Sequence, residues 1–287
     1  MSNATHPGQD GAGVREYLQR FGIYTILGLF ILWTLVPIVW MFLSSLKVRS
    51  GMFQMPPQLL FEPTLQYYQE LLFGSNPLTK YLLNSAIVSI ASAAIAITFG
   101  TLGGYGLSRL RIKGKKHFAF WIISTRMAPI AVVIVPLYLL YQFAGLLNTR
   151  LGLVIAYTTF NLPFAIWLMR SFFDEVPEAL EEAARIDGAT QWQAFYKVAL
   201  PLVLPGIGAT AIISIVFAWN DFLFALIFTN NETQTIPVAA AQLVTQTGTL
   251  WGQVMAIGIV ILTPMVLFGL IVKNYLVSGL TMGAMKQ

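Results

Sequence analysis

The sequence has 287 residues, of which 56% are hydrophobic and only 10% are charged, and its mean hydropathy is +0.70. Because a soluble domain carries about 25% charged residues, this composition excludes an ordinary soluble protein and is typical of a polytopic membrane protein. The absence of cysteine excludes disulfide bonds and thiolate metal sites. The formal net charge of +5 does not indicate a nucleic-acid partner, because the distribution of the charges along the chain is explained by orientation in a membrane.

Six apolar segments follow one another along the chain. Residues 1–22 precede them as a short polar tail, either an interfacial helix or, as we prefer, a frayed terminus. The first segment, 23–43, is too long for the core of a signal peptide and has no A-x-A cleavage site after it. The others lie at about 82–104, 118–141, 151–170, 202–228 and 251–274. Each can cross an apolar layer of roughly 30 Å as a helix. We therefore predict an all-α bundle of about six transmembrane helices, with one transmembrane domain over residues 23–275 and a tail at 276–287.

Lysine and arginine are unevenly distributed between the two sides of this bundle. Twelve lie on the side that receives both ends of the chain and residues 171–201, and four lie on the other. The first group is Arg15, Arg20, Arg109, Arg111, Lys113, Lys115, Lys116, Arg170, Arg185, Lys197, Lys273 and Lys286, and the second is Lys47, Arg49, Lys80 and Arg150. The positive-inside rule then predicts cytoplasmic termini and a cytoplasmic loop 171–201. The basic turn at 109–116 also contacts anionic membrane lipid in this interpretation.

The long polar stretch 171–201 reads as two short helices joined by a turn. Pro177 at a first helical position starts one helix, and Glu181 and Arg185 have the spacing of an ion pair on an exposed helix face. Gly188 is the left-handed residue that ends this helix. A capping box at 190–193 begins the second helix, and the proline at position 201 bounds it.

Leu180, Ala183 and Ala184 fall at i, i+3 and i+4 and form one apolar stripe on the first of these helices. Between two membrane spans, such a helix is a rigid projection into water with a face that another protein can approach closely. The alternative is a solvated connector helix that happens to be acidic. This alternative explains the polarity, but it gives no reason for the spacing of the glycine and of the distant Leu-Pro pair.

Residues that would support an enzyme are missing from the sequence. It contains no G-x-x-x-x-G-K-[ST] motif, so it does not bind ATP by a P-loop. His6 and His117 are isolated and lack metal-ligand spacing, and no nucleophile–base pair stands out. We predict a non-catalytic chain that binds no cofactor and no metal.

Several polar residues lie at membrane depth. Arg126 is roughly 12 Å into its span, where an unpaired charge costs at least ~2.5–3.5 kcal/mol. It either faces the protein interior or snorkels to the membrane surface. Asn161, Trp219, Asn220 and Asp221 lie on otherwise apolar segments. Amide and indole groups can bind sugar hydroxyls and stack on a sugar ring, and they can equally join helices to one another.

The chain resembles the permease subunits of ABC importers, because Glu182-Ala183-Ala184, three residues and Gly188 follow their coupling-loop pattern. Val198 stands where the usual pattern has isoleucine. Further segments, which together cover roughly residues 20–287, resemble the carbohydrate-uptake branch of these permeases. Their order matches that of a six-span permease of the maltose-transporter type. The segments are Asn84-Ser85, 105–111, 125–127, 134–138, 145–149, 162–164, 219–222 and 279–284.

This resemblance implies a type I importer permease fold and a place in the bacterial inner membrane. It implies ATP-driven uptake of a sugar, oligosaccharide or polyol, with coupling to an ATPase through Glu182, Ala183, Ala184, Asp187 and Gly188. The expected partners are a second permease subunit, two cytoplasmic ATPases that bind ATP and Mg²⁺, and an extracytoplasmic solute-binding protein.

Two alternatives to carbohydrate uptake are an ABC permease for another solute and, less favoured, a secondary carrier. A carrier would need ligands for a coupling ion near the membrane midplane, and the spans hold almost no acidic residues. A membrane scaffold without transport activity would leave the polar groups in several spans unexplained.

Overall fold

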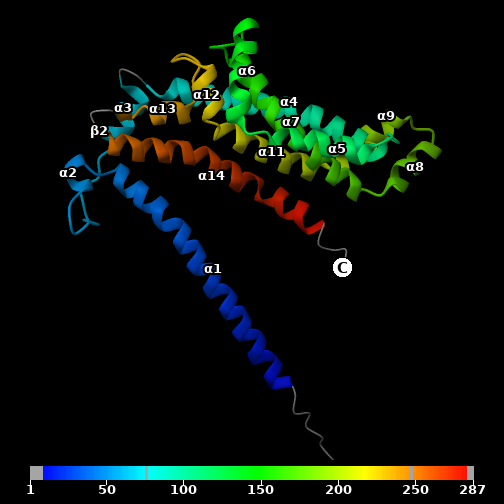
Figure 1. Cartoon of the computed structure of the whole chain (residues 1–287). Helices are drawn as coiled ribbons and strands as arrows, with labels where there is room; N and C mark the ends of the chain where they lie inside the picture. Colours follow the sequence, from blue (N-terminus) through cyan, green and yellow to red (C-terminus); the bar gives the residue numbers. More distant parts are fainter. Residues whose placement is uncertain (1–8, 75–76, 246–247, 283–287) are drawn as a thin grey trace, which may run out of the picture.

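The computed structural model describes residues 9–74, 77–245 and 248–282, and helices account for most of them (Figure 1). The first half of the chain forms α1 (Gln9–Ser45), α2 (Arg49–Met52), α3 (Gln66–Phe73), α4 (Thr79–Arg109), α5 (Lys115–Ser124), η1 (Thr125–Met127) and α6 (Ile130–Phe143). The second half forms α7 (Arg150–Glu175), α8 (Glu178–Ile186), α9 (Gln191–Ala194), the π-helical turn η2 (Phe195–Ala199), α10 (Leu200–Leu202), α11 (Leu204–Trp219), α12 (Leu223–Phe228), α13 (Ile236–Ala241) and α14 (Trp251–Met282). A short antiparallel ribbon, β1 (Val244–Thr245) with β2 (Gly248–Thr249), precedes α14.

The number of spans agrees with the prediction from hydropathy. Over the described residues, four helices are long and apolar enough to cross a membrane, within α1, α4, α7 and α14. Two bent pairs of helices raise the number to six if each pair is one span.

The third and fifth predicted spans are broken helices. Lys115–Met127 and Ile130–Phe143 meet at an angle of 88°. Ala128 and Pro129 between them are extended, because a proline removes a backbone donor and disfavours the helical region for the residue before it. Gln191–Leu202 and Leu204–Trp219 meet at 71°. The predicted fifth span, 202–228, therefore ends as a continuous helix at Trp219, and α12 follows as a separate short helix.

The two predicted tails are more helical than expected. Helix α1 begins at Gln9, so the preference for a frayed terminus over 1–22 was wrong from this residue onward. Helix α14 continues to Met282, which places most of the predicted tail 276–287 in a helix. The remaining tail residues, 1–8 and 283–287, lie outside the described part of the chain.

Helices α4 and α7 make the most extensive helix–helix contact in the described structure. Small side chains allow the backbones to approach closely. A Cβ added at Gly100 would lie 2.6 Å from the Cβ of Ala165, and one added at Gly104 would lie 2.7 Å from the backbone nitrogen of Arg170. The two glycines thus form a packing face, as small residues do between membrane helices.

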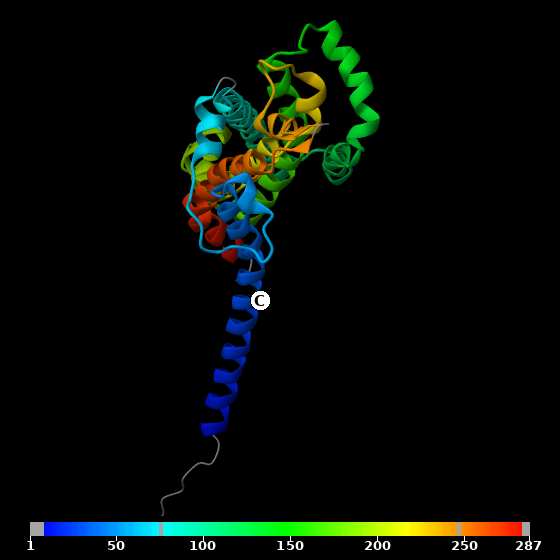
Figure 2. The ribbon, with the colours of Figure 1, turned by 90° about the vertical axis from the view of Figure 1, so that its left-hand side faces the viewer.

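Helix α1 differs from this packed pair. Its C-terminal part packs on α14, where Gly258 lies against the sulfur of Met41. Toward its N-terminus α1 diverges from the bundle, as two views at right angles show (Figures 1 and 2). The apolar side chains along this part, such as Phe30 and Trp33, are exposed, which suits contact with lipid or another membrane subunit.

Candidate coupling loop and intramembrane cavity

The turn that ends α8 has the geometry predicted from the sequence. Gly188 has a φ of +92°, in the left-handed region. The amides that follow the helix bond back to it, Asp187 to the carbonyl of Ala183 and Ala189 to that of Ala184. Gly188 therefore closes the helix and turns the chain towards α9, and the predicted conformation is confirmed.

A capping box starts the next helix, as predicted. The Gln193 backbone amide donates to Thr190 Oγ1 at 3.2 Å, and the Thr190 amide donates to Gln193 Oε1 at 2.8 Å. The prediction of one helix bounded by Pro201 was wrong, because α9 continues through the π-helical turn η2 into α10, and the bend occurs at Val203. Similarly, Pro177 precedes the first helical residue of α8 instead of occupying it.

Glu181 is the largest departure from the sequence prediction. It does not pair with Arg185 on an exposed face, because Glu181 is buried against the end of α4. Arg109 Nε donates to Glu181 Oε1 at 2.6 Å, and the Tyr105 hydroxyl donates to Glu181 Oε2 at 2.7 Å. The ion pair joins residues 72 positions apart, a tertiary contact that no local pattern indicates.

Arg109 makes further hydrogen bonds that fix the start of α8. Its Nη1 donates to Ser108 Oγ at 2.9 Å and its Nη2 to the carbonyl of Val176 at 2.7 Å. Ser108 in turn donates to Asp174 Oδ1 at 2.5 Å. The side chains of Arg109 and Glu181 are only 7% and 8% exposed, so this is a buried ion pair in which each guanidinium nitrogen of Arg109 makes a hydrogen bond.

Aromatic side chains hold the second half of the loop in place. The ring of Tyr105 lies 5.3 Å from that of Phe173 and 4.5 Å from that of Phe195, and Trp192 lies 5.0 Å from Phe195 between ring centroids. Tyr105, Phe173 and Phe195 belong to one buried cluster with Met169. The helices α8 and α9 are therefore fastened to α4 and α7 at both halves of the loop.

With this inner face fixed, the residues predicted to couple to an ATPase lie on the outer face. Glu182, Ala183, Asp187 and Gly188 are exposed, and Ala184 is half-buried. Figure 1 shows α8 and α9 projecting at one end of the bundle. The loop thus projects from the bundle and presents small side chains together with the exposed carboxylates of Glu182 and Asp187.

A cavity of about 180 Å³ lies between the broken third span, α7 and the end of α11. Arg126 lies in its wall, and its guanidinium carbon is 4.8 Å from the ring centroid of Phe164 and 4.3 Å from that of Phe217. Two cation–π contacts hold the side chain in the protein, so it does not snorkel away from the interior. Among the described residues, the buried Nη1 of Arg126 has no hydrogen-bond partner.

The structure brings together three of the five predicted pathway residues. Arg126, Asn161 and Asp221 line the cavity, together with Ile130, Tyr157, Phe160, Phe217, Ala218 and Phe224. Asn161 also joins two helices, because its Nδ2 donates to the carbonyl of Ser214 at 3.2 Å. Asp221 accepts a hydrogen bond from the Ala225 amide at 3.4 Å.

The other two predicted residues lie elsewhere. Trp219 is buried in an apolar cluster with Ile236 and Ala256. Asn220 is exposed, and its Nδ2 donates to the carbonyl of Val216 within its own chain segment. Tyr157 and the phenylalanines of the cavity were not predicted, because aromatic residues inside apolar spans carry no signal that separates a cavity wall from ordinary packing.

Comparisons with known proteins agree with this geometry. Residues 96–281, most of the chain, match the family described as the inner membrane component of binding-protein-dependent transport systems. The chain belongs to this family. It is therefore a multi-pass protein of the inner membrane and a transport permease subunit.

Relatives extend the match over nearly the whole chain. A probable ABC transporter permease protein of Sinorhizobium fredii, y4oR, is 40% identical over 88% of this chain and 90% of its own length. The trehalose transport system permease protein SugB of Mycobacterium tuberculosis is 36% identical over 88% and 93%. A crystal structure of a bacterial ABC transporter involved in the import of alginate has the same fold, with a TM-score of 0.73 at 24% identity over 94% of this chain and 99% of that one.

Proposed function

We propose that this chain is the transmembrane permease subunit of an ATP-driven ABC importer for a carbohydrate, and that it forms half of the translocation pathway. The observation that carries the proposal is the coupling loop. Its buried side is fastened to α4 by the Arg109–Glu181 pair, and its free side presents Glu182 and Ala183. The carbohydrate class is supported by relatives such as the trehalose transport system permease of Mycobacterium tuberculosis.

In this proposal α8 docks in a groove of a cytoplasmic ATPase. The small side chains of Ala183 and Ala184 allow a close helix-in-groove contact, and the exposed carboxylate of Glu182 meets a basic or backbone group of the partner. The loop 171–201 and both termini are then cytoplasmic, as the excess of lysine and arginine on that side indicates. ATP and Mg²⁺ bind to the ATPase, because this sequence has no P-loop.

The remaining partners are a second permease subunit, a second ATPase and an extracytoplasmic solute-binding protein. The exposed apolar length of α1 supports a membrane-embedded contact with the second permease. The polar residues Arg126, Asn161, Trp219, Asn220 and Asp221 are proposed to belong to the solute pathway, and the cavity supports this role for Arg126, Asn161 and Asp221.

The decisive experiment is co-purification followed by transport in proteoliposomes. The tagged chain is isolated from membranes of its own host, and the proteins that accompany it are identified by mass spectrometry. We expect an ATPase, a second permease and a solute-binding protein. The complex is then reconstituted, and uptake of labelled trehalose and maltose is measured with and without ATP inside the vesicles. Uptake that follows an ion gradient and ignores ATP would refute the proposal in favour of a secondary carrier.

The orientation is tested separately. Because the chain has no cysteine, a single cysteine in place of Asp187 can be labelled in intact cells without background. We expect no reaction with a membrane-impermeant maleimide until the cells are permeabilised. Strong labelling of intact cells would refute a cytoplasmic coupling loop.

A further inference from the structure

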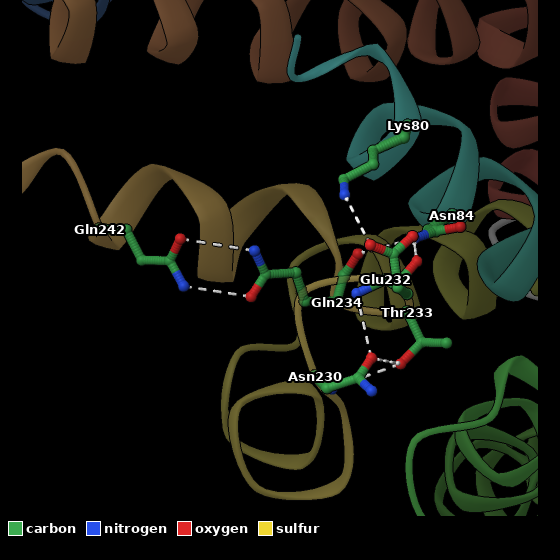
Figure 3. A network of polar contacts seen from close by, with 7 residues as sticks. All are labelled: Lys80, Asn84, Asn230, Glu232, Thr233, Gln234 and Gln242. Carbon is green, nitrogen blue, oxygen red and sulfur yellow. Dashed lines mark hydrogen bonds and ion pairs between the residues drawn. The ribbon is translucent and has the colours of Figure 1, made fainter. Parts of the chain in front are cut away.

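The end of the bundle opposite the coupling loop contains a second polar cluster on α4, centred on Asn84 (Figure 3). Asn84 is fully buried, and its amide bonds in three directions. Its Nδ2 donates to the carbonyls of Glu232 and Gln234, both at 3.0 Å, and its Oδ1 accepts from Arg150 Nε at 2.8 Å. One side chain thus joins α4, the first residue of α7 and the segment between α12 and α13.

Two neighbours on the same face of α4 hold the same segment. Ser85 Oγ accepts the backbone amide of Ile236 at 2.9 Å, which is the first residue of α13 and has no partner within its helix. Lys80 Nζ lies 3.3 Å from Glu232 Oε1. Residues 232–236, which we call the outer segment, have little regular structure of their own, so α4 side chains satisfy the backbone groups that a helix or sheet would otherwise satisfy.

Helix α4 therefore carries a polar clamp at each end. The inner clamp holds α8 through Tyr105 and Arg109, and the outer clamp holds the outer segment through Asn84. Asn84 and Arg109 are separated by about seven helical turns, or ~37 Å, so they lie on nearly the same face of the helix.

Two features of the helix between the clamps favour movement as one body. It contains no proline, whereas α1, α6, α7 and α14 each contain one inside the helix. Its buried face consists mostly of small residues, and α4 packs along it on α7 and α11, with the closest approach to α7 at Gly100 and Gly104. Packed helices of this kind shift between discrete arrangements and do not bend continuously.

We propose that α4 connects the coupling loop mechanically to the outer segment, so that a displacement of α8 at one membrane surface moves residues 232–236 at the other, with Asn84 as the positioning residue. The inference rests on the proposed function, because it requires an ATPase that displaces α8. No contact between Asn84 and solute or ATPase is needed. Asn84 acts through the backbone of the outer segment.

The test follows the two ends of α4 separately. Single cysteines replace Ala179 on α8 and Asn231 beside the outer segment, both exposed positions outside the clamps, and each carries a spin label. In the reconstituted complex, spectra are compared without nucleotide and with ATP plus vanadate. We expect both labels to respond in the otherwise unchanged protein. With Asn84→Ala, the label at 179 still responds, and the response at 231 falls at least fivefold.

ATP hydrolysis gives a second readout. Asn84→Ala should leave basal hydrolysis within twofold and reduce stimulation by the solute-binding protein at least fivefold. Asn84→Asp keeps the acceptor for Arg150 but places a carboxylate oxygen opposite the two carbonyls that Nδ2 bonds, and we expect the same pattern from it. Ser92→Ala is the matched control: Ser92 is equally buried on α4, but its hydroxyl bonds within the helix, to the carbonyl of Ser89. It should change neither readout.

The outcomes separate the inference from the function on which it rests. Suppose that the spin label at position 179 responds to nucleotide and that the label at position 231 responds equally in the unchanged protein and in Asn84→Ala. The docking of α8 then stands and the inference is overturned. If 179 is silent in the protein with intact clamps, the proposed docking fails, and the inference fails with it. A loss at 231 that Ser92→Ala reproduces would also overturn the role of Asn84, since any buried polar deletion would then have the same effect.

Discussion

Two arginines in this molecule are removed from water in opposite ways. Arg109, under the coupling loop, donates from its Nε, Nη1 and Nη2 to Glu181, Ser108 and the carbonyl of Val176. Arg126, in the wall of the cavity, is held between the rings of Phe164 and Phe217 and keeps a buried Nη1 without a partner among the described residues.

The comparison separates a structural charge from an available one. The Arg109–Glu181 pair is closed off from solvent and directs every guanidinium nitrogen to a protein acceptor, so its role is to hold α8 against α4. The guanidinium of Arg126 is positioned by aromatic rings alone, and its N–H groups remain able to donate hydrogen bonds to the hydroxyl groups of a solute. The Arg109–Glu181 pair therefore fastens the coupling loop to α4, whereas Arg126 brings an unpartnered donor to the cavity, among the described residues.

Replacing Arg109 should have the largest effect on stability. Arg109→Ala leaves the buried Glu181 carboxylate without its cation, and breaking a buried pair in this way costs about 3–5 kcal/mol. We expect a lower unfolding temperature for the purified complex and loss of uptake, because the start of α8 is no longer fastened to α4.

Arg185→Ala is the control for this change. Arg185 is exposed and is the partner that helical spacing assigns to Glu181. We expect its removal to change stability by no more than ~0.5 kcal/mol. Equal destabilisation by the two substitutions would contradict the buried pair seen here.

The next effect concerns the direction in which the rigid loop points. Gly188→Val introduces a β-branched residue at φ +92°, which strains the backbone by about 1–3 kcal/mol. An added Cβ would meet no atom within 4 Å, so the strain comes from the backbone conformation and not from crowding. We expect the chain to remain in the membrane and to lose ATPase co-purification and uptake together. Gly188→Asn, which tolerates the left-handed region, should retain most of both.

Ala183→Trp tests the exposed face without touching the buried one. Ala183 is exposed, so a large side chain fits the isolated subunit and should not lower its unfolding temperature. It should nevertheless separate α8 from the ATPase and abolish ATP-dependent uptake. Ala183→Ser is the matched small substitution and should transport normally. Full ATPase occupancy and normal uptake with tryptophan at this position would remove the docking assignment.

For Arg126, the main expected effect of a substitution is on transport. Arg126→Leu removes two cation–π contacts, worth about 0.5–2 kcal/mol each, and also a partly desolvated charge, so the two effects partly offset and the free energy of unfolding should change by only about 1–2 kcal/mol. A hydrogen bond from a charged group contributes about 1.5–3 kcal/mol, so the KM for uptake should rise roughly 10- to 100-fold. Arg126→Lys keeps the charge but loses the planar stacking on the rings, and its KM should lie between those of the unchanged protein and of Arg126→Leu. An unchanged KM would make Arg126 a packing residue.

The sequence predicted the elements whose causes are local. Span number follows from hydropathy, the turn at Gly188 from a single conformational preference, and the capping box at 190–193 from two side chains three residues apart. The features that were predicted wrongly depend on residues far away in the sequence. Glu181 matched a local pair with Arg185, yet it bonds to Arg109, because burial against α4 makes a tertiary partner available.

The cavity was only partly predictable for the same reason. Polar residues in apolar spans stand out in a sequence, and three of the five so identified do line one cavity. The sequence could not separate these from Trp219, whose indole is buried among apolar side chains. It also gave no indication that the bend at Pro129 brings Arg126 against the ring of Phe217.

The smallest expected effect comes from Asn161, which belongs to both classes of polar residue. It lines the cavity beside Arg126, but its Nδ2 is already used in a hydrogen bond to the carbonyl of Ser214 on α11. Asn161→Ala should therefore cost about 1 kcal/mol of stability and raise the KM for uptake by only about two- to threefold, because only its amide oxygen remains for a solute. Unfolding and uptake are measured on the same preparation as for Arg126→Leu. If Asn161→Ala raises the KM as much as Arg126→Leu and leaves stability unchanged, then the bond to Ser214 does not hold the helices together. Asn161, whose amide already has a partner, would then bind solute as well as Arg126, which has none among the described residues. The presence of a protein partner would then not predict which polar groups of the cavity bind solute.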